Sequence, residues 1–195
     1  MHADMAVAMR RTRSWAGRFD RTTIALHWLT LLLVVAQFTT ALMLAGGGED
    51  RFSSLLLLAI HRSTGVVTWW VVVGRLLWRA ARAHLPPFPA SMSKLQQSIA
   101  KANEYGLYAL LVLQPLTGLG DTVFRGRPFV LFGLTVPEML EPEKAVFQAL
   151  HAAHVWGAIA LALLIALHAG AALLHGVALR DGVLQRMLPW TMSDA

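Results

Sequence analysis

Long apolar runs separated by shorter polar stretches set the pattern of this 195-residue chain. The runs cover about residues 22–45, 55–78, 105–124 and 149–177. Each is near the length of about 20 residues that a helix needs to cross the hydrocarbon of a membrane. Helices are required, because lipid offers exposed backbone groups no hydrogen-bond partners. The pattern therefore predicts an all-α membrane protein, a bundle of four transmembrane helices.

The composition supports this prediction. Hydrophobic residues make up 56% of the chain, charged residues 14%, and the mean hydropathy is +0.53. Such a sequence is too apolar for an ordinary water-soluble domain. The first run is about twice as long as the apolar core of a signal peptide, so we interpret it as a retained helix. Because the sequence lacks repeats and low-complexity segments, residues 1–195 are expected to form a single membrane domain.

Two segments between the runs are irregular. The prolines of "RAHLPPFPASMSK" are incompatible with a helix and predict a loop between the second and third spans. The segment "GRPFVLFGLTVPEMLEPE", after the third span, has enough apolar residues to lie along the bilayer surface. Pro115 falls inside the third span and is expected to kink it.

The basic residues predict the orientation, because cytoplasmic connections retain Lys and Arg. They are concentrated before the first span and after the second: Arg10, Arg11, Arg13, Arg18, Arg21, Arg75, Arg79, Arg82, Lys94 and Lys101. The other connections hold Arg51, Arg125, Arg127 and Lys144, diluted by Glu49, Asp50, Asp121, Glu138, Glu141 and Glu143. Both termini are therefore expected in the cytoplasm.

The formal charge of +6 and the isoelectric point near 10.8 raise the question of nucleic-acid binding. However, the basic residues lie at the ends of the spans, where anionic lipid head groups account for them. We therefore expect membrane lipid as a partner, and no nucleic acid.

Histidine is the residue type that points to chemistry. The chain has no cysteine, which excludes iron–sulfur ligands, covalent c-type haem attachment and disulfides. Of the eight histidines, His2 and His84 lie outside the spans and are expected to be solvated. The others lie in or beside the spans: His27, His61, His151, His154, His168 and His175. An ionisable side chain in a bilayer is costly and indicates function, although a helix-to-helix hydrogen bond would account for any one of them.

The spacing of these histidines predicts two facing pairs. His154 and His168 are 14 residues apart, which on a helix is within about 40° of whole turns and rises about 21 Å. They therefore share one face at two depths. Because the first two spans run antiparallel, His27 should be level with His168, and His61 with His154. Each pair suits the two axial ligands of one haem b, and two pairs suit two haems. His151 is turned by about 100° from the face of His168, so His154 is preferred as the ligand.

Other uses of these histidines fit less well. A single zinc ion cannot be reached by two pairs separated by about 20 Å. A proton-conducting chain would ordinarily recruit carboxylates within the membrane, and the spans contain essentially none. Gly65, Gly157 and Gly170 lie near the histidines, where they either make room for a flat macrocycle or serve helix packing.

Several motifs resemble those of the bacterial cytochrome b561 family, in the same order and over nearly the whole chain. They are "ALHWLT", "IHRSTGVVTWWVVVGRLLWR", "HVWGAIALALLIALHAGAALLHG" and "LRDGVLQRMLP". The segment "FQALHAAH" departs from the pattern, since His151 competes there with His154.

The resemblance implies a multi-pass protein of the bacterial inner membrane with two haems b. It assigns His27 and His168 to the cytoplasmic haem, and His61 and His154 to the periplasmic one. It further implies electron transfer to or from membrane quinone. Some members of that family oxidise superoxide at the periplasmic face while reducing ubiquinone.

Further residues have candidate roles. Arg62, next to His61 and deep in the apolar run, is expected to bind a haem propionate. Arg75 and Arg79 have two equal alternatives, a propionate or lipid head groups. His175 either helps to bind quinone or a propionate, or is a solvated interfacial residue. The third span is expected to be scaffold, with Gln114 in a quinone cleft. The tryptophans are interpreted as anchors or packing residues: Trp28, Trp69, Trp70, Trp78 and Trp156.

The sequence thus predicts a dihaem cytochrome b that transfers electrons between quinone and a small periplasmic redox partner. Superoxide is one candidate donor, which would make the protein a superoxide:ubiquinone oxidoreductase. Arg51, Arg62, Arg125 and Arg127 would attract this anion, against the field of Glu49, Asp50 and the acidic run 138–143. A second hypothesis is a haem-bearing anchor subunit that relays electrons for a dehydrogenase or hydrogenase, which the short loops disfavour. A third is a haem-free transporter or proton channel.

Overall fold

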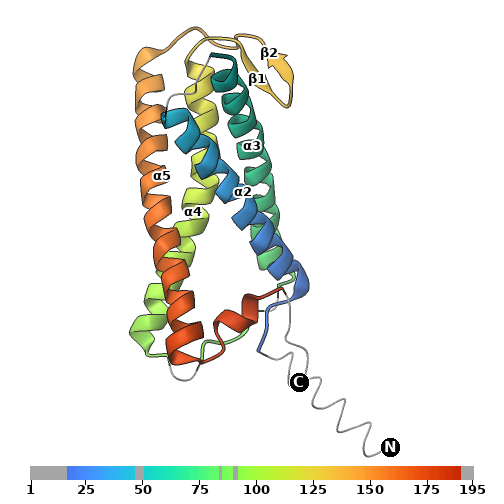
Figure 1. Ribbon diagram of the computed structural model, residues 1–195, viewed down its shortest axis with the longest axis vertical. Helices are drawn as coiled ribbons and strands as arrows, with labels where there is room; N and C mark the ends of the chain where they lie inside the picture. The colour runs from blue at the N-terminus through green and yellow to red at the C-terminus, as the bar shows by residue number, and fades with distance from the viewer. Residues whose placement is uncertain (1–16, 47–50, 84, 90–91, 190–195) are drawn as a thin grey trace, which may run out of the picture.

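The computed structural model describes residues 17–46, 51–83, 85–89 and 92–189. These residues form four long helices: α2 (Arg21–Ala45), α3 (Arg51–Ala81), α4 (Lys94–Phe124) and α5 (Lys144–Leu173). A π-helical turn, η1 (Leu174–Leu179), continues α5, and a 3-10 turn, η2 (Leu184–Met187), follows. Successive helices run in opposite directions along the long axis (Figure 1). Each of the four, α5 together with η1, is long and apolar enough to cross a membrane, as the hydrophobic pattern predicts.

The helices are longer than most of the apolar runs. α3 extends past both ends of 55–78, and α4 begins at Lys94 rather than near residue 105. A capping box sets this early start: the Ser93 hydroxyl accepts from the Gln96 N–H, and the Gln96 side chain accepts from the Ser93 N–H. The predicted proline loop is confirmed for the residues that the structure describes between Ala81 and Lys94. Pro115 lies within α4, which continues through it.

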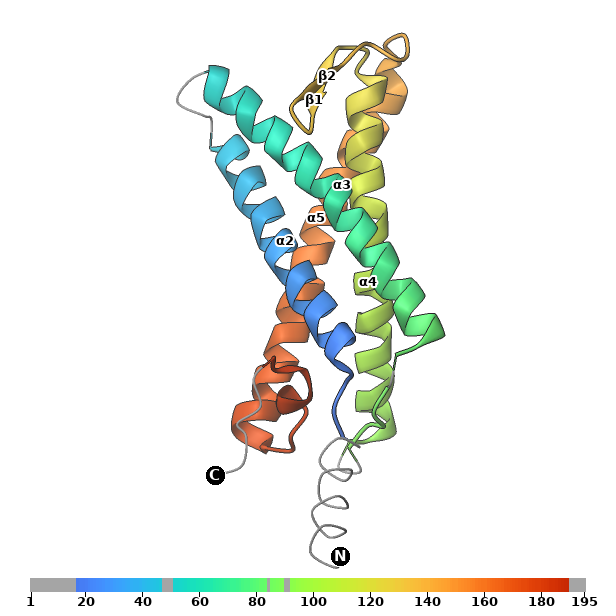
Figure 2. The same ribbon diagram turned by 90° about the vertical axis from the view of Figure 1, so that its right-hand side faces the viewer.

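A short hairpin replaces part of the segment that we expected to be irregular, so that expectation is wrong for β1 (Phe129–Leu131) and β2 (Leu134–Val136). The two strands pair antiparallel. Phe132 and Gly133 both adopt positive φ, 51° and 78°, the geometry that closes a two-residue hairpin. The Phe132 N–H donates to the Ser63 hydroxyl at 2.8 Å, which fastens the hairpin to the side of α3 (Figure 2). We call this end of the bundle the hairpin end and the other the opposite end.

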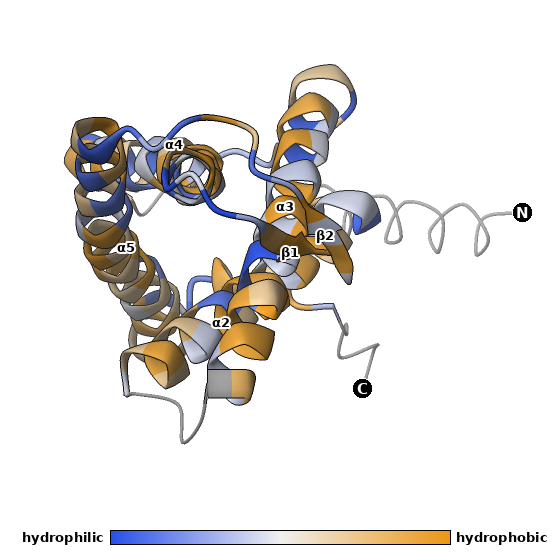
Figure 3. Ribbon diagram, turned by 90° about the horizontal axis from the view of Figure 1, so that it is seen from above, coloured by the Kyte–Doolittle hydropathy of each residue, from blue (hydrophilic) through white to orange (hydrophobic). Residues whose placement is uncertain are grey.

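The centre of the bundle is a small apolar cluster with one residue from each long helix, listed here: Val34, Val72, Leu111 and Leu161. Around it, buried positions are often polar, for example Thr30, Thr68 and Asn103. Large apolar side chains instead face outward, and Figure 3 shows hydrophobic residues along all four helices. Polar groups inside and apolar groups outside suit a bundle surrounded by lipid.

A set of polar contacts locks the opposite end. The Asp20 carboxylate caps α2 by accepting from the Thr23 backbone N–H at 2.9 Å. It also accepts from the Trp78 indole at 3.0 Å, which joins the end of α3 to the start of α2. The Trp28 indole donates to the Met187 carbonyl at 2.8 Å and holds η2 against the same end. α2 and α3 are therefore fixed in register with each other at the level where His27 lies.

Candidate functional site

Two pairs of imidazole rings face each other across the interior, as the spacing predicts. His27 on α2 lies 6.1 Å from His168 on α5, measured between ring centroids, and the ring planes are inclined by 55°. His61 on α3 lies 6.2 Å from His154 on α5, with planes at 87°. The His27–His168 pair lies toward the opposite end of the bundle, and the His61–His154 pair lies toward the hairpin end. The assignment of these residues as ligands stays a prediction, but the fold brings the expected partners together.

The spacing within each pair fits an iron atom held from both sides. Two axial imidazoles place their centroids about 6 Å apart, because each metal–nitrogen bond is about 2 Å and each nitrogen lies about 1 Å from its ring centre. Across residues 17–189, with the gaps given above, no three His, Cys, Asp or Glu side chains converge on one point. A closed tetrahedral site therefore does not fit the described part of the chain, whereas paired axial ligation does.

The apolar cluster separates the two pairs. Leu161 lies seven residues after His154 and seven before His168, so it marks the midpoint of α5 between them. The rise of 14 residues along a helix is about 21 Å. The two histidine pairs are therefore stacked along the bundle axis, one near each end.

The Nδ1 atoms of the hairpin-side pair are engaged by a neighbouring helix. His61 Nδ1 lies 2.9 Å from the Thr40 hydroxyl on α2. His154 Nδ1 lies 3.1 Å from the Gln114 carbonyl and 3.2 Å from the Thr117 hydroxyl on α4. Sequence reasoning missed Thr40 and Thr117, although hydroxyl groups inside apolar runs were a signal. Gln114, expected in a quinone cleft, donates its side-chain amide to the His154 carbonyl at 3.0 Å.

Arg75 lies beside the other pair. Its terminal nitrogen is 3.2 Å from His27 Nδ1, and its guanidinium lies over the Tyr108 ring. The Nε atom of Arg75 is buried without a hydrogen-bond partner among the residues that the structure describes. A buried, incompletely paired guanidinium suits an anionic group such as a haem propionate. Arg79 differs, because it forms an ion pair with Glu104 at 2.8 Å.

Arg62 points toward the hairpin. Its Nε donates to the Thr122 hydroxyl at 3.1 Å, and its guanidinium lies over the Phe129 ring. Its predicted contact with a propionate stays a prediction.

His151 lies apart from the facing rings. Its Nδ1 is 3.2 Å from the Asp121 carboxylate, and its ring stacks on Phe147. Asp121 also pairs with Arg125 at 3.3 Å. His151, the alternative to His154 as a ligand, therefore lies in a separate cluster with Asp121 and Phe147 at the hairpin end.

His175 is buried rather than solvated, which decides against one of its two expected environments. Its Nδ1 donates to the Asp181 carboxylate at 2.5 Å. This hydrogen bond is the main reason that the pKa of Asp181 lies below its ordinary value. The pair closes the turn that follows α5. His2 and His84, which are expected to be solvated, lie outside the described residues.

The tryptophans fall into two groups. Trp70 and Trp156 are largely exposed on the outside of the bundle, as expected of anchors facing lipid. Trp28 and Trp78 hold the opposite end through the hydrogen bonds described above. Trp69 packs edge-on against Trp70, and its indole nitrogen is buried without a partner among the described residues.

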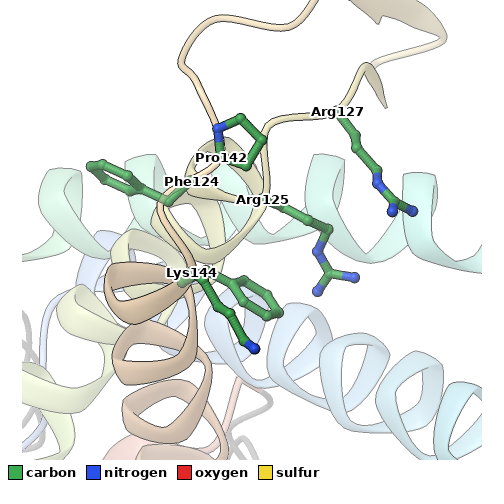
Figure 4. Close-up of a pocket in the computed structure, with 6 residues that line it drawn as sticks. Phe124, Arg125, Arg127, Pro142 and Lys144 are labelled. Atoms are coloured by element: carbon green, nitrogen blue, oxygen red, sulfur yellow. The ribbon is translucent and has the colours of Figure 1, made fainter.

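A shallow pocket at the hairpin end collects positive charge (Figure 4). It is lined by Phe124, Arg125, Arg127, Pro142, Lys144 and Phe147. Arg125 and Arg127, two of the cations expected to attract an anion, thus meet in one place. Glu49 and Asp50, and the side chain of Arg51, lie outside the described residues.

Two facing histidine pairs inside a bundle of four apolar helices are the features that define the class of this multi-pass membrane protein. The family model described as prokaryotic cytochrome b561 matches residues 18–190, and the chain belongs to this family. Cytochrome b561 homolog 1 of Escherichia coli (strain K12) is 33% identical over 179 residues, 89% of this chain and 98% of that protein. Cytochrome b561 homolog 2 of the same organism is 29% identical over 178 residues, which are 91% of this chain and 94% of that protein. A protein of Yersinia pestis named probable superoxide oxidase CybB is 30% identical over 172 residues, which are 88% of this chain and 96% of that protein. Membership of the family implies haem b as cofactor.

Proposed function

We propose that this protein is a dihaem cytochrome b that transfers electrons across the bacterial inner membrane between quinone and a small periplasmic redox partner. The observation that carries the proposal is the presence of two facing histidine pairs, 6.1 Å and 6.2 Å between centroids, near opposite ends of one bundle. A route between two membrane faces needs such a site near each face. The absence of a large soluble domain from the described residues favours small partners on both sides.

His27 and His168 hold one haem, and His61 and His154 hold the other. The haems supply the one-electron chemistry, while the protein supplies position and electrostatic surroundings. Arg75 neutralises a propionate at the opposite end, where its buried Nε is available. Arg62 has the corresponding position next to His61 and neutralises a propionate there.

The opposite end faces the cytoplasm in this proposal. It carries most of the described basic residues: Arg18, Arg21, Arg75, Arg79, Arg82, Lys94, Lys101, Arg180 and Arg186. The hairpin end carries both signs, including Asp121, Glu138, Glu141 and Glu143. This asymmetry satisfies the positive-inside rule with the hairpin in the periplasm.

Superoxide is the donor that the hairpin end favours. Arg125, Arg127 and Lys144 gather in one pocket there, and such a pocket raises the local concentration of a small anion. The relative of Yersinia pestis named probable superoxide oxidase adds support. In the balanced reaction, two superoxide ions lose one electron each and become two molecules of dioxygen. One ubiquinone takes up these two electrons and two protons to give ubiquinol.

Stopped-flow mixing of the purified, oxidised protein with ubiquinol tests the quinone half of the proposal. We expect reduction of the haem absorption bands. If no quinol reduces either haem, the quinone role is wrong.

Superoxide consumption, measured with and without ubiquinone and in the His61→Ala variant, tests the periplasmic half of the proposal. If superoxide consumption depends neither on ubiquinone nor on His61, superoxide is not the donor, and the protein transfers electrons to or from another periplasmic partner. If electron transfer requires an added protein, the anchor-subunit hypothesis is supported.

A further inference from the structure

The same short motif, Gln-x-x-Thr, lies beside both histidines of the hairpin-side pair. It occurs as Gln37–Thr40 on α2, next to His61, and as Gln114–Thr117 on α4, next to His154. The two copies have the same offset of three residues, which places Gln and Thr on one face of a helix. In both helix pairs, α2 with α3 and α4 with α5, one helix thus contacts the histidine of the other through a Gln and a Thr.

On α2, the motif holds both the backbone and the ring of His61. The Gln37 amide donates to the His61 carbonyl at 3.0 Å. Thr40 is buried, and its hydroxyl lies 2.9 Å from His61 Nδ1. The same hydroxyl donates to the backbone carbonyls of Ala36 and Gln37, at 2.9 Å and 3.0 Å. Since its only proton is used there, the hydroxyl oxygen accepts a hydrogen bond from His61 Nδ1–H.

On α4, the motif repeats these contacts on His154. The Gln114 amide donates to the His154 carbonyl at 3.0 Å. His154 Nδ1 lies 3.1 Å from the Gln114 backbone carbonyl, which can only accept, so Nδ1 carries the proton. The Thr117 hydroxyl donates to the same carbonyl at 2.9 Å and lies 3.2 Å from the ring nitrogen.

Glycines allow the helices to approach closely enough for these contacts. A Cβ on Gly157 would lie 3.2 Å from three atoms of the Gln114 amide, and one on Gly118 would lie 2.9 Å from His154 Cε1. A Cβ on Gly65 would lie 3.6 Å from Gln37 Oε1. Of the two roles expected for Gly65 and Gly157, helix packing is the one that these distances support.

We propose that the two Gln-x-x-Thr motifs are positioning elements that fix the Nδ1–H tautomer and the direction of the His61 and His154 rings. With Nδ1 protonated, the lone pair of each ring is at Nε2, the atom that is left to bind a metal. This reading rests on the proposed function, because it assigns the motifs to one of the two haem sites. The Nδ1–H bond to a neutral oxygen also raises the basicity of the ligand and favours the oxidised iron.

Among the described residues, the His27–His168 pair has no corresponding arrangement. His27 Nδ1 faces Arg75, whose guanidinium can only donate. A guanidinium that donates to Nδ1 favours the opposite tautomer, with the proton on Nε2. His27 Nε2 can therefore bind a metal only when Arg75 turns from this nitrogen to another anion, such as the proposed propionate. The two sites are therefore tuned by different means, and changes in the motifs should affect the His61–His154 site alone.

Thr40→Val and Thr117→Val test the proposal, because valine keeps the shape of threonine and removes the hydroxyl. In the haem-loaded protein, Thr40→Val should speed haem loss from this site by roughly 10–100-fold and raise its midpoint potential. Thr117→Val should act in the same direction but less strongly, because the Gln114 carbonyl still accepts from His154 Nδ1–H. Thr40→Ser should restore the wild-type values. Thr30→Val and Thr68→Val are matched controls, since both threonines are buried and, among the described residues, each hydroxyl bonds to a carbonyl of its own helix. The proposal would be overturned if the control variants changed haem loss and midpoint potential as much as the test variants do. It would also be overturned if both quantities were unchanged in Thr40→Val and Thr117→Val.

Nitrogen-15 NMR of the imidazoles in haem-free protein gives a second, independent readout. We expect His61 and His154 as Nδ1–H tautomers in the wild type, and a mixture for His61 in Thr40→Val. If either wild-type ring carries its proton on Nε2, the positioning role is wrong. A wild-type protein that binds no haem but shows the expected tautomers would sink the proposed function and leave the positioning of the rings intact.

Discussion

His61 and His154 face each other at 6.2 Å between ring centroids although 93 positions separate them in the sequence. Helix α5 makes this contact and, two turns past the midpoint at Leu161, also presents His168 to His27. One helix therefore contributes a ring to each pair, while α2 and α3 contribute one ring each. Any shift of α5 along its axis would disturb both sites together, whereas a change in α2 or α3 would act first on one.

Single alanine substitutions should sort the four histidines into two groups. The purified wild type is expected to carry two low-spin haems b per chain, extractable by acid acetone because no cysteine tethers them. His27→Ala and His168→Ala should remove or convert the same spectral component. His61→Ala and His154→Ala should affect the other. A haem-to-protein ratio of one, or a component shared across the groups, would contradict the pairing.

His151→Ala should leave both haem components in place. His151 bonds to Asp121 and stacks on Phe147, outside the facing pairs. Haem content and the reduced-minus-oxidised spectrum give the measurement, with His154→Ala as the matched comparison on the same helix. Loss of haem in His151→Ala together with its retention in His154→Ala would show that the ligand on this helix has been assigned wrongly.

The presence of four helices and the pairing of the facing histidines could be predicted from periodicity and from the antiparallel course of the spans. Four apolar runs set the helices, and 14 residues between His154 and His168 set their common face. The preference for His154 over His151 also came from helical phase, and the fold places only His154 opposite His61. Such properties are local and repeat along one element, so a sequence reveals them.

Contacts between elements were harder to predict. Nothing in the sequence order says that Thr40 meets His61 or that Gln114 meets His154, because these contacts depend on helix rotation and separation. The hairpin was missed because its turn contains Phe132 at positive φ, where Gly or Asn is usual. Gly118 gave no signal either, since its role appears only when α4 and α5 are side by side.

Gly118→Ala should damage the hairpin-side site. A Cβ there would lie 2.9 Å from His154 Cε1 and would force the ring or the helix to move. Such overpacking typically costs about 1–3 kcal/mol. We expect partial loss or high-spin conversion of the component that His61→Ala also affects, seen by absorption spectroscopy. Gly74→Ala is the control, because a Cβ on Gly74 meets nothing within 4 Å. Identical spectra for the Gly118→Ala variant and the wild type would contradict this account.

Asp181→Asn should loosen the turn after α5. The Asp181 carboxylate accepts from His175 and from the Val183 N–H, and these bonds lower the pKa of Asp181 below its ordinary 3.8. A lowered pKa means that the stabilisation is complete above 3.8 and is lost as the pH falls through the folded-state value. Protection from hydrogen exchange in residues 174–188, relative to the intrinsic rate at each pH, should therefore be lower in the variant at neutral pH. In the wild type, titration of Asp181 should not change this protection between pH 7 and pH 5. Glu141→Gln, at the hairpin end, serves as the control. Equal exchange in the Asp181→Asn variant and the wild type would contradict the role of this pair.

The cationic pocket should set the rate at which a small anion reduces the protein from the hairpin end. Arg127→Gln and Lys144→Gln remove positive charge from the pocket without touching a histidine. Each should slow the second-order reduction by superoxide by about two- to tenfold at low ionic strength, because the field that concentrates the anion is weaker. The difference should fade as salt approaches about 1 M, where the Debye length is about 3 Å. Arg82→Gln removes an exposed charge at the opposite end and should leave the rate unchanged. Reduction by ubiquinol, a neutral donor, should be the same in all three variants. A superoxide rate that is insensitive to salt and to both pocket variants would show that the anion does not enter through this pocket.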